Sequence, residues 1–412
     1  MSPASALRPA PIVRSAPTMR RTVLLLAFCQ ALAMTGNSIV ATTASIIGSM
    51  LAPQRALSTL PVALQMTGTM LATIPASLLM ARLGRRGGFW AGITLGIAGA
   101  TTASLGIFAG AFPVFCAGTM MLGAYNGFAQ QYRFAAAEVA DDAFRSKAVS
   151  LVLAGGVASA IFGPETAKWS RDLFAPVLFA GCYAVVAALC VAAAAVLFFV
   201  RIPKPPVPVL RGGGRPLTEI AAQPLFIAAA ISGMVGYGVM SMVMTATPIA
   251  MLDCGFGFPD AAFIIQWHAL GMYAPSFVTG HLIARFGVTN ILLTGAGLLL
   301  ACFGVNLSGI AELNFWSALV LLGIGWNFLF VGATTLVTRT YVASERAKVQ
   351  ALNDFLIFGT VAVSSFSSGA LLSAWGWRTV QLAGMPFVVV AVLVAVWLKL
   401  RGWRAAPRYA GQ

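Results

Sequence analysis

Charged side chains are scarce in this chain. Asp, Glu, Lys and Arg together account for 9% of its 412 residues, whereas hydrophobic residues account for 59%. A soluble domain of this composition has too few polar side chains to cover its surface, which excludes a water-soluble protein. We therefore predict an all-α membrane protein.

Enzyme motifs are missing as well. The sequence contains no H-E-x-x-H, G-x-S-x-G or G-x-x-x-x-G-K-[ST] motif, and two histidines leave little acid–base chemistry. His268 and His281 lie 13 residues apart and would point to different sides of one helix, so they cannot form one metal site. The six cysteines have neither metal-ligand nor disulfide spacing. We expect no enzyme, no metal site and no cofactor.

Long apolar runs are what the sequence does contain. About twelve of them reach roughly 20 residues, the length at which an α-helix crosses the hydrocarbon core of a bilayer. We expect a monomeric multi-pass protein of a bacterial inner (cell) membrane, surrounded by the lipid bilayer. The predicted spans are 22–47, 57–81, 89–110, 112–138, 148–169, 174–200, 223–251, 258–284, 289–310, 313–338, 348–374 and 378–400.

The formal net charge of +15 has two possible explanations. A nucleic-acid binder gathers its basic residues on one solvated face, but here they are scattered through short loops, so we expect no nucleic-acid partner. If the N-terminus is cytoplasmic, 21 of the 26 basic residues fall on the cytoplasmic side. This positive-inside bias predicts that both termini are cytoplasmic.

The chain contains an internal repeat. Residues 64–84 align without a gap with residues 267–287, and Asn126 and Asn327 form a second echo at nearly the same offset. An even number of spans separates the copies, which predicts two parallel six-helix bundles in the same orientation. The predicted organisation is a cytoplasmic tail (1–21), an N-terminal bundle (22–200), a cytoplasmic linker (201–222), a C-terminal bundle (223–400) and a second tail (401–412).

The loop after the second span resembles the signature G-x-x-x-D-R-x-G-R-R of the major facilitator superfamily. Arg82, Gly84, Arg85 and Arg86 match this signature, whereas Ala81 stands where the signature has an acid. The span number, the repeat and the linker extend the resemblance over nearly the whole chain. It implies a secondary transporter that works by alternating access, with a cavity lined mainly by the first, fourth, seventh and tenth spans.

The loop arginines have two interpretations. They could hold the topology by meeting lipid phosphates, or they could form charge pairs that close the cytoplasmic side and break when the halves rock. The second interpretation needs acids, and Asp354 lies about six residues into its helix, where an ionised carboxylate is costly without a partner. We therefore predict a pair between Asp354 and Arg82 or Arg86, rather than an acid favoured only by a helix dipole. The predicted cytoplasmic gate comprises Arg82, Gly84, Arg85, Arg86, Glu138, Arg285 and Asp354.

Polar side chains within spans mark the expected substrate pathway, because they are costly in a membrane. Asn126, Gln130 and Arg133 have helical spacing and share one stripe. The alternative for each Asn or Gln is a hydrogen bond between helices, and Arg133 could instead snorkel or pair with Glu138. If Arg133 faces the cavity, the substrate is anionic. The predicted cavity residues are Gln30, Asn37, Asn126, Gln130, Arg133, Tyr237, Ser241 and Asn327.

Coupling and direction rest on weaker patterns. His268 is a titratable side chain near mid-span, so it is a candidate proton carrier together with Asp354, although it could simply be hydrogen-bonded. Gly163 and Pro164 resemble part of an antiporter signature of the superfamily. We predict a proton-coupled secondary transporter of a small organic solute, with export slightly favoured. An importer of an anionic metabolite or nutrient, or a non-transporting membrane sensor, is the alternative.

Overall fold

The computed structural model describes residues 16–141, 144–200, 202, 214–342 and 344–401. These residues form helices and no strand. Much of the predicted tails and linker, together with Asp142, lies outside the described residues. The first half of the fold contains α1 (Ala16–Leu51), η1 (Arg55–Leu57), α2 (Leu60–Phe108), α3 (Phe112–Ala129), α4 (Tyr132–Val139), α5 (Arg145–Ser170) and α6 (Ala180–Phe198).

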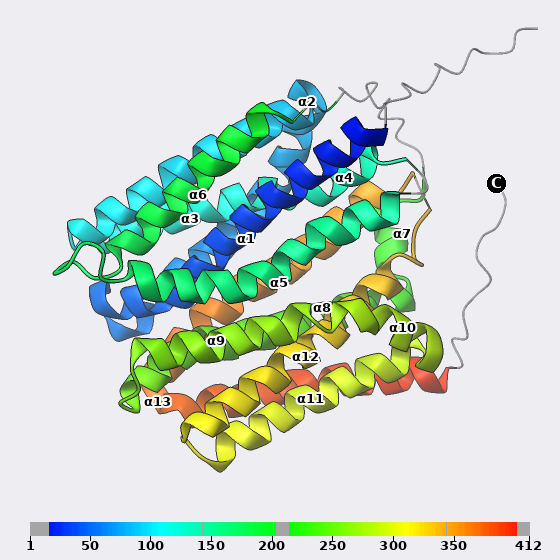
Figure 1. Ribbon diagram of the computed structural model, residues 1–412. Coiled ribbons are helices and arrows are strands. Elements are labelled where there is room, and N and C mark those ends of the chain that lie inside the picture. Colours follow the sequence, from blue (N-terminus) through cyan, green and yellow to red (C-terminus); the bar gives the residue numbers. More distant parts are fainter. Residues whose placement is uncertain (1–15, 142–143, 201, 203–213, 343, 402–412) are drawn as a thin grey trace, which may run out of the picture.

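The second half of the fold follows the linker and lies beside the first. In Figure 1 most blue-to-green helices of the first half lie above the lime-to-red helices of the second half, and an orange part of α13 is seen between α1 and α5. The second half contains α7 (Leu217–Ala221), α8 (Pro224–Asp253), α9 (Phe258–Tyr273), α10 (Ser276–Phe286), α11 (Val288–Ser308), α12 (Glu312–Val337) and α13 (Arg346–Leu400).

Two of the helices are hairpins that turn at a glycine. Gly84 in α2 has φ 81° and Gly376 in α13 has φ 77°, values that glycine adopts without a Cβ clash. Gly68 and Gly99 of α2 both lie against the same turn of α3, so the two arms of α2 run antiparallel. The arms of α13 do the same, because Ser368 and Gly384 both lie against Met242 of α8.

Two other segments are broken within their length. The chain leaves helical hydrogen bonding between α3 and α4 and again between α9 and α10, where Pro275 has no N–H to donate. Asn327 of α12 compensates for the second break, since its Nδ2 donates to the backbone oxygen of Met272 (2.7 Å) and to Oγ of Ser276 (2.6 Å). Its Oδ1 accepts a hydrogen bond from Thr279 (2.6 Å).

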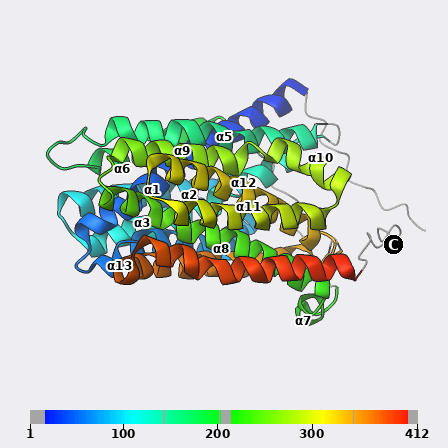
Figure 2. The same ribbon diagram turned by 90° about the horizontal axis from the view of Figure 1, so that it is seen from below.

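Seven helices within the described residues are long and apolar enough to cross a membrane. This number is smaller than the twelve predicted spans because each hairpin is one continuous helix, the fourth and eighth predicted spans are each divided into two shorter helices, and α5, which covers the fifth predicted span, is not among the seven. The helices run roughly parallel, as the view in Figure 2 also shows. We call the end of the bundle with Gly84 and Glu345 the Arg85 end, and the opposite end, with Asp253, the Arg55 end.

Candidate functional site

The two halves contact each other at the Arg55 end. Arg55 of η1 forms an ion pair with Asp253 at the end of α8. The hydroxyl of Thr59 donates to the backbone oxygen of Phe366 (3.3 Å) and accepts from the backbone N–H of Gly369 (3.1 Å). Phe179 and Phe258 pack edge to face, with centroids 5.0 Å apart. These contacts close this end of the interface between the halves.

The predicted gate arginines have different partners at the Arg85 end. Arg85 donates to the carboxylate of Glu138 (Nε to Oε2, 3.0 Å) and to Gln131 (3.0 Å). Arg86 donates to the backbone oxygen of Phe198 (3.0 Å). These partners belong to the first half, whereas Arg82 and Arg285 are exposed. In this conformation Arg85 and Arg86 therefore stabilise one half rather than joining the two.

Asp354 of α13 accepts a hydrogen bond from Asn353 (3.4 Å), and the described residues give it no ion pair. The guanidinium of Arg133 in α4 is near enough to act electrostatically on this carboxylate from the other half, and the predicted pair of Asp354 with Arg82 or Arg86 stays a prediction. Both side chains are half-buried, and the Arg133 guanidinium lies over the ring of Phe134, 4.8 Å from its centroid. The repeat pattern could not identify this partner, because Arg133 was assigned to the cavity stripe and not to the gate.

An amide cluster of Asn37, Gln65 and Asn126 lies inside the first half. These side chains line a narrow cavity of about 10 Å³, which is room for about one water molecule. Gln65 donates to Oδ1 of Asn37 (2.8 Å), and its own Oε1 is buried without a hydrogen-bond partner among the described residues. Gln30, two turns earlier on the same face of α1, also has a buried Oε1 of this kind. Sequence reasoning missed Gln65, although the repeat aligns it with His268.

An aromatic cluster fills the corresponding position of the second half. Trp326 and Phe330 of α12 stack with centroids 5.0 Å apart, and Tyr237 of α8 meets Trp326 edge to face at 5.2 Å. Phe358 of α13 and Tyr273 of α9 complete the cluster. Trp326 buries its Nε1 without an acceptor among the described residues. The sequence search found only Tyr237 of this cluster, because it looked for stripes of polar side chains.

The aromatic cluster lies at the interface between the halves. A Cβ added at Gly156 of α5 would meet the ring of Tyr273 at 3.2 Å and the methyl of Met34 at the same distance. Helices α1, α5 and α9 therefore meet beside the cluster. Gln130 and Asn37 are half-buried on the first half of the fold.

Three other predicted residues make contacts between helices of the second half. Ser241 shares a hydrogen bond with Ser365 (2.6 Å), and both are buried. Asn327 is fully buried, and its side chain makes the hydrogen bonds that stabilise the break after α9. His268 is buried, and its Nδ1 lies 2.9 Å from the backbone oxygen of Leu319. Each of these contacts joins neighbouring helices. The cavity and proton-carrier roles of these residues stay predictions.

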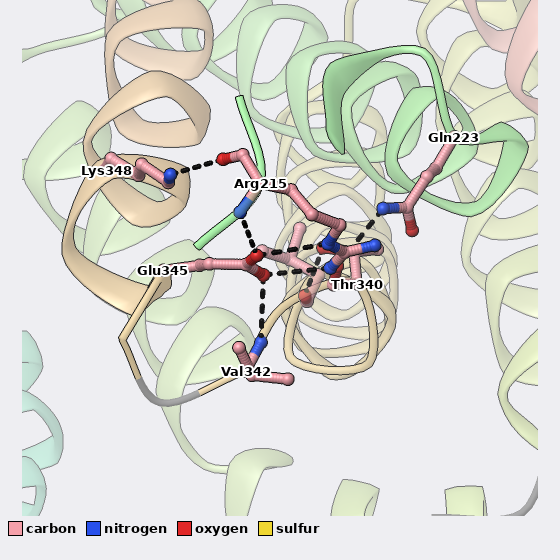
Figure 3. Close-up of polar contacts among 7 residues, drawn as sticks. Arg215, Gln223, Thr340, Val342, Glu345 and Lys348 are labelled. Atoms are coloured by element: carbon pink, nitrogen blue, oxygen red, sulfur yellow. Dashed lines mark hydrogen bonds and ion pairs between the residues drawn. The ribbon is translucent and has the colours of Figure 1, made fainter. Parts of the chain in front are cut away.

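The end of the linker is fastened to the second half at the Arg85 end, as Figure 3 shows. The backbone N–H and the guanidinium of Arg215 both donate to the carboxylate of Glu345 (2.7 to 3.0 Å), whose side chain is 1% exposed. Arg215 also donates to the backbone oxygen of Thr340 (2.9 Å), and Lys348 donates to the backbone oxygen of Arg215. The guanidinium lowers the pKa of Glu345 from 4.5 to about 2. Sequence reasoning missed this pair, because it assigned Arg215 to a solvated linker.

Two antiparallel hairpins, broken helices and an interface closed at one end define the fold of a membrane carrier. The family model of the Major Facilitator Superfamily matches residues 26–356, and the chain belongs to this superfamily. Its members are transporters and not enzymes, which agrees with the absence of catalytic motifs from the sequence.

Two relatives within the superfamily align with nearly the whole chain. The chain is 42% identical over 391 residues to the riboflavin transporter RfnT of Brucella anthropi, covering 94% of this chain and 98% of the relative. It is 27% identical over 398 residues to the uncharacterized MFS-type transporter YdeG of Bacillus subtilis, covering 93% of each.

Solved structures share the fold at low sequence identity. The nucleoside transporter NupG superposes with a TM-score of 0.70 at 15% identity, over 92% of this chain and 99% of that chain. A POT family transporter in complex with 5-aminolevulinic acid superposes with a TM-score of 0.75 at 12% identity, over 92% and 96%. These likenesses bear on the fold alone.

Proposed function

We propose that this protein carries riboflavin across a bacterial inner membrane. The observation that carries the proposal is the 42% identity, over nearly the full length of both chains, to a protein named as a riboflavin transporter. The aromatic cluster and the amide cluster suit such a substrate chemically. Riboflavin is a flat tricyclic ring with amide-like edges and a polyol chain, so it needs both a stacking surface and hydrogen-bond partners.

The aromatic cluster provides the surface on which the flavin ring stacks. Trp326 has the largest ring of the cluster, and its Nε1 has no acceptor among the described residues, so it can also donate a hydrogen bond to the substrate. In the first half, the half-buried Asn37 and Asn126 supply hydrogen-bond donors and acceptors to the substrate, and the buried Gln65 holds Asn37 in place. Arg133 is not needed for an uncharged ring, and its role moves from substrate recognition to the charge interaction with Asp354.

We place twelve membrane crossings in the fold. Each arm of α2 and α13 counts as one crossing, α3 with α4 and α9 with α10 count as one each, and the remaining long helices complete the number. An even number leaves both termini on one side, and the basic loops at the Arg85 end make that side the cytoplasm. The six crossings before the linker and the six after it form the two bundles (22–200 and 223–400), and one chain forms the working unit.

Transport proceeds by alternating access. The contacts at the Arg55 end are consistent with a state that is closed toward the outside, and opening toward the outside breaks the Arg55–Asp253 pair and the Thr59 hydrogen bonds. Protonation of Asp354 would release Arg133, which is the arrangement a proton-coupled carrier needs. The net direction of riboflavin transport follows the coupled ion gradient. Measuring flux under an imposed pH gradient therefore distinguishes the export that the sequence slightly favours from the alternative of import.

Counterflow in proteoliposomes tests the proposal. Vesicles that contain the purified protein and are loaded with unlabelled riboflavin should take up labelled riboflavin faster than empty vesicles, and an imposed pH gradient should change the rate in one direction. Saturable binding of riboflavin without flux would instead favour a sensor. The absence of both binding and flux would contradict the riboflavin assignment.

A matched pair of variants tests the stacking surface. Trp326→Ala should raise the KM for riboflavin about three- to tenfold, because an aromatic pair contributes about 0.5–1.5 kcal/mol beyond its buried area. Trp326→Phe keeps a ring but loses the indole N–H, so its KM should lie between those of wild type and Trp326→Ala. Trp375→Ala, at a tryptophan that is 69% exposed near Gly376, is the control for loss of an indole. An unchanged KM in Trp326→Ala would exclude this ring as the stacking surface.

A further inference from the structure

A groove lies on the outer surface of the second half, near the Arg55 end, away from the aromatic and amide clusters. Its volume is about 380 Å³, and it is formed where α9 and α12 begin. Phe263 and Trp267 line it from α9, and Glu312, Leu313 and Trp316 line it from α12. Nothing in the transport cycle described above uses this groove.

Three aromatic rings form a corner in the groove. Trp267 and Trp316 have centroids 5.7 Å apart at an interplanar angle of 72°, and Phe263 meets Trp267 at 6.3 Å and 71°. Rings at nearly right angles present two negative faces to one space, which is how aromatic cages hold an ammonium group. Phe263 and Trp267 are 41% and 40% exposed, so their faces are accessible from the side of the bundle.

A carboxylate closes one side of this corner. Glu312 is the first residue of α12, its side chain is exposed, and the described residues give it no ion-pair partner. The groove thus combines an anionic group at a helix end with apolar ring surface and the exposed Leu313 (71% exposed). This charge pattern is complementary to a cationic head that carries an apolar body, and it disfavours an anionic head.

The groove is rigid because α9 and α12 pack closely behind it. A Cβ added at Gly323 would meet the backbone oxygen of His268 at 2.5 Å, and one at Gly271 would meet that of Val320 at 3.1 Å. Small residues of this kind allow helices to approach in a membrane. The ring of His268 adds a contact to the backbone oxygen of Leu319 at 2.9 Å. This close packing fixes the two helices that carry the rings relative to each other.

We propose that this groove binds a membrane phospholipid whose head group carries a primary ammonium, such as phosphatidylethanolamine. The ammonium lies against the faces of Trp267 and Trp316 and pairs with the carboxylate of Glu312. The lipid body lies along Leu313 and Phe263. Tryptophan favours the membrane interface even without a neighbouring carboxylate or a second ring. This general preference therefore does not explain why Trp267, Trp316 and Glu312 line one groove.

Lipid retention by the purified full-length protein tests this site. The protein is delipidated, incubated with phosphatidylethanolamine or phosphatidylglycerol of identical acyl chains, and analysed by native mass spectrometry. Wild type should retain phosphatidylethanolamine about fivefold more than phosphatidylglycerol, a preference of the size that a cation–π contact with an exposed ion pair provides. Glu312→Gln and Trp316→Leu should each reduce this preference toward equality.

Glu165→Gln is the matched control. Glu165 is another exposed carboxylate near the Arg55 end, in α5, and it pairs with Lys168 outside the groove. This variant should keep the wild-type preference. Equal retention of the two lipids by wild type, or an unchanged preference in Glu312→Gln, would overturn the proposal. Glu312→Gln preserves the shape of the side chain, so it tests the lipid site even if Trp316→Leu fails to fold. The lipid-retention results do not depend on whether the protein transports riboflavin.

Discussion

Gly369→Ala should open the Arg55 end of the interface. A Cβ at this position would lie 2.5 Å from Oγ1 of Thr59 and 3.1 Å from its Cγ2, with the backbone oxygen of Ala56 at 3.2 Å. The neighbours are a short, branched side chain and backbone, so they cannot move aside without separating α13 from the start of α2. The substitution therefore disfavours the state in which these helices touch.

The magnitude follows from overpacking. An extra methyl in a tightly packed contact costs about 1–3 kcal/mol, which changes the ratio of closed to open molecules by a factor of about 5 to 150. Alanine also favours a helix over glycine by about 1 kcal/mol, but this gain is the same in both states. Gly304→Ala is the matched control, because no heavy atom lies within 4 Å of an added Cβ at that helical glycine.

Distances between spin labels measure the effect. Labels at Gln54 and Trp375 report the separation of the halves at the Arg55 end, in a background where the exposed Cys254 is replaced by Ser. Gly369→Ala should shift the distribution to longer distances, and Gly304→Ala should not. A distribution for Gly369→Ala that matches wild type would refute the reasoning.

Three further predictions concern stability and coupling. Asn327→Ala leaves the carbonyl of the break after α9 without its donor and should cost about 1–3 kcal/mol, seen as a lower Tm in detergent than for the exposed control Asn290→Ala. Because the folded-state pKa of Glu345 is lowered to about 2 from 4.5, its contribution to folding stability is complete above about pH 5.5 and is lost as pH falls toward 2. The stability difference between wild type and Glu345→Gln should therefore be constant from about pH 8 to 5.5 and narrow below about pH 4.5. A difference that changes between pH 8 and 6 would contradict this. Asp354→Asn should impair riboflavin counterflow in a folded protein, whereas the exposed control Glu219→Gln should not, and normal flux in Asp354→Asn would exclude a role for the charge.

The helices could be predicted from the sequence because the thickness of a bilayer fixes the length of an apolar run. The turn at Gly84 was also predictable, since a glycine beside arginines between two apolar runs indicates a loop. The break after α9 was not predicted, because Pro275 lies within an apolar run and proline is tolerated in a membrane helix when a neighbour supplies a donor. That donor, Asn327, is recognisable only once α12 is placed.

Partners across the halves could not be predicted. Arg55 and Asp253 are separated by 198 residues, and no periodicity links the end of one helix to the loop of another. The repeat was informative about position but misleading about role. Asn126 and Asn327 align, yet Asn126 lines a cavity with Gln65 whereas Asn327 braces a broken helix, because the neighbouring residues of the two copies have diverged.

The closed Arg55 end gives the molecule a sidedness that matters for drug action. A membrane-impermeant competitor added from that side meets Arg55, Asp253 and the Phe179–Phe258 contact rather than the aromatic cluster. Its inhibition should therefore begin only as the transporter turns over, with an onset rate that rises with substrate supply.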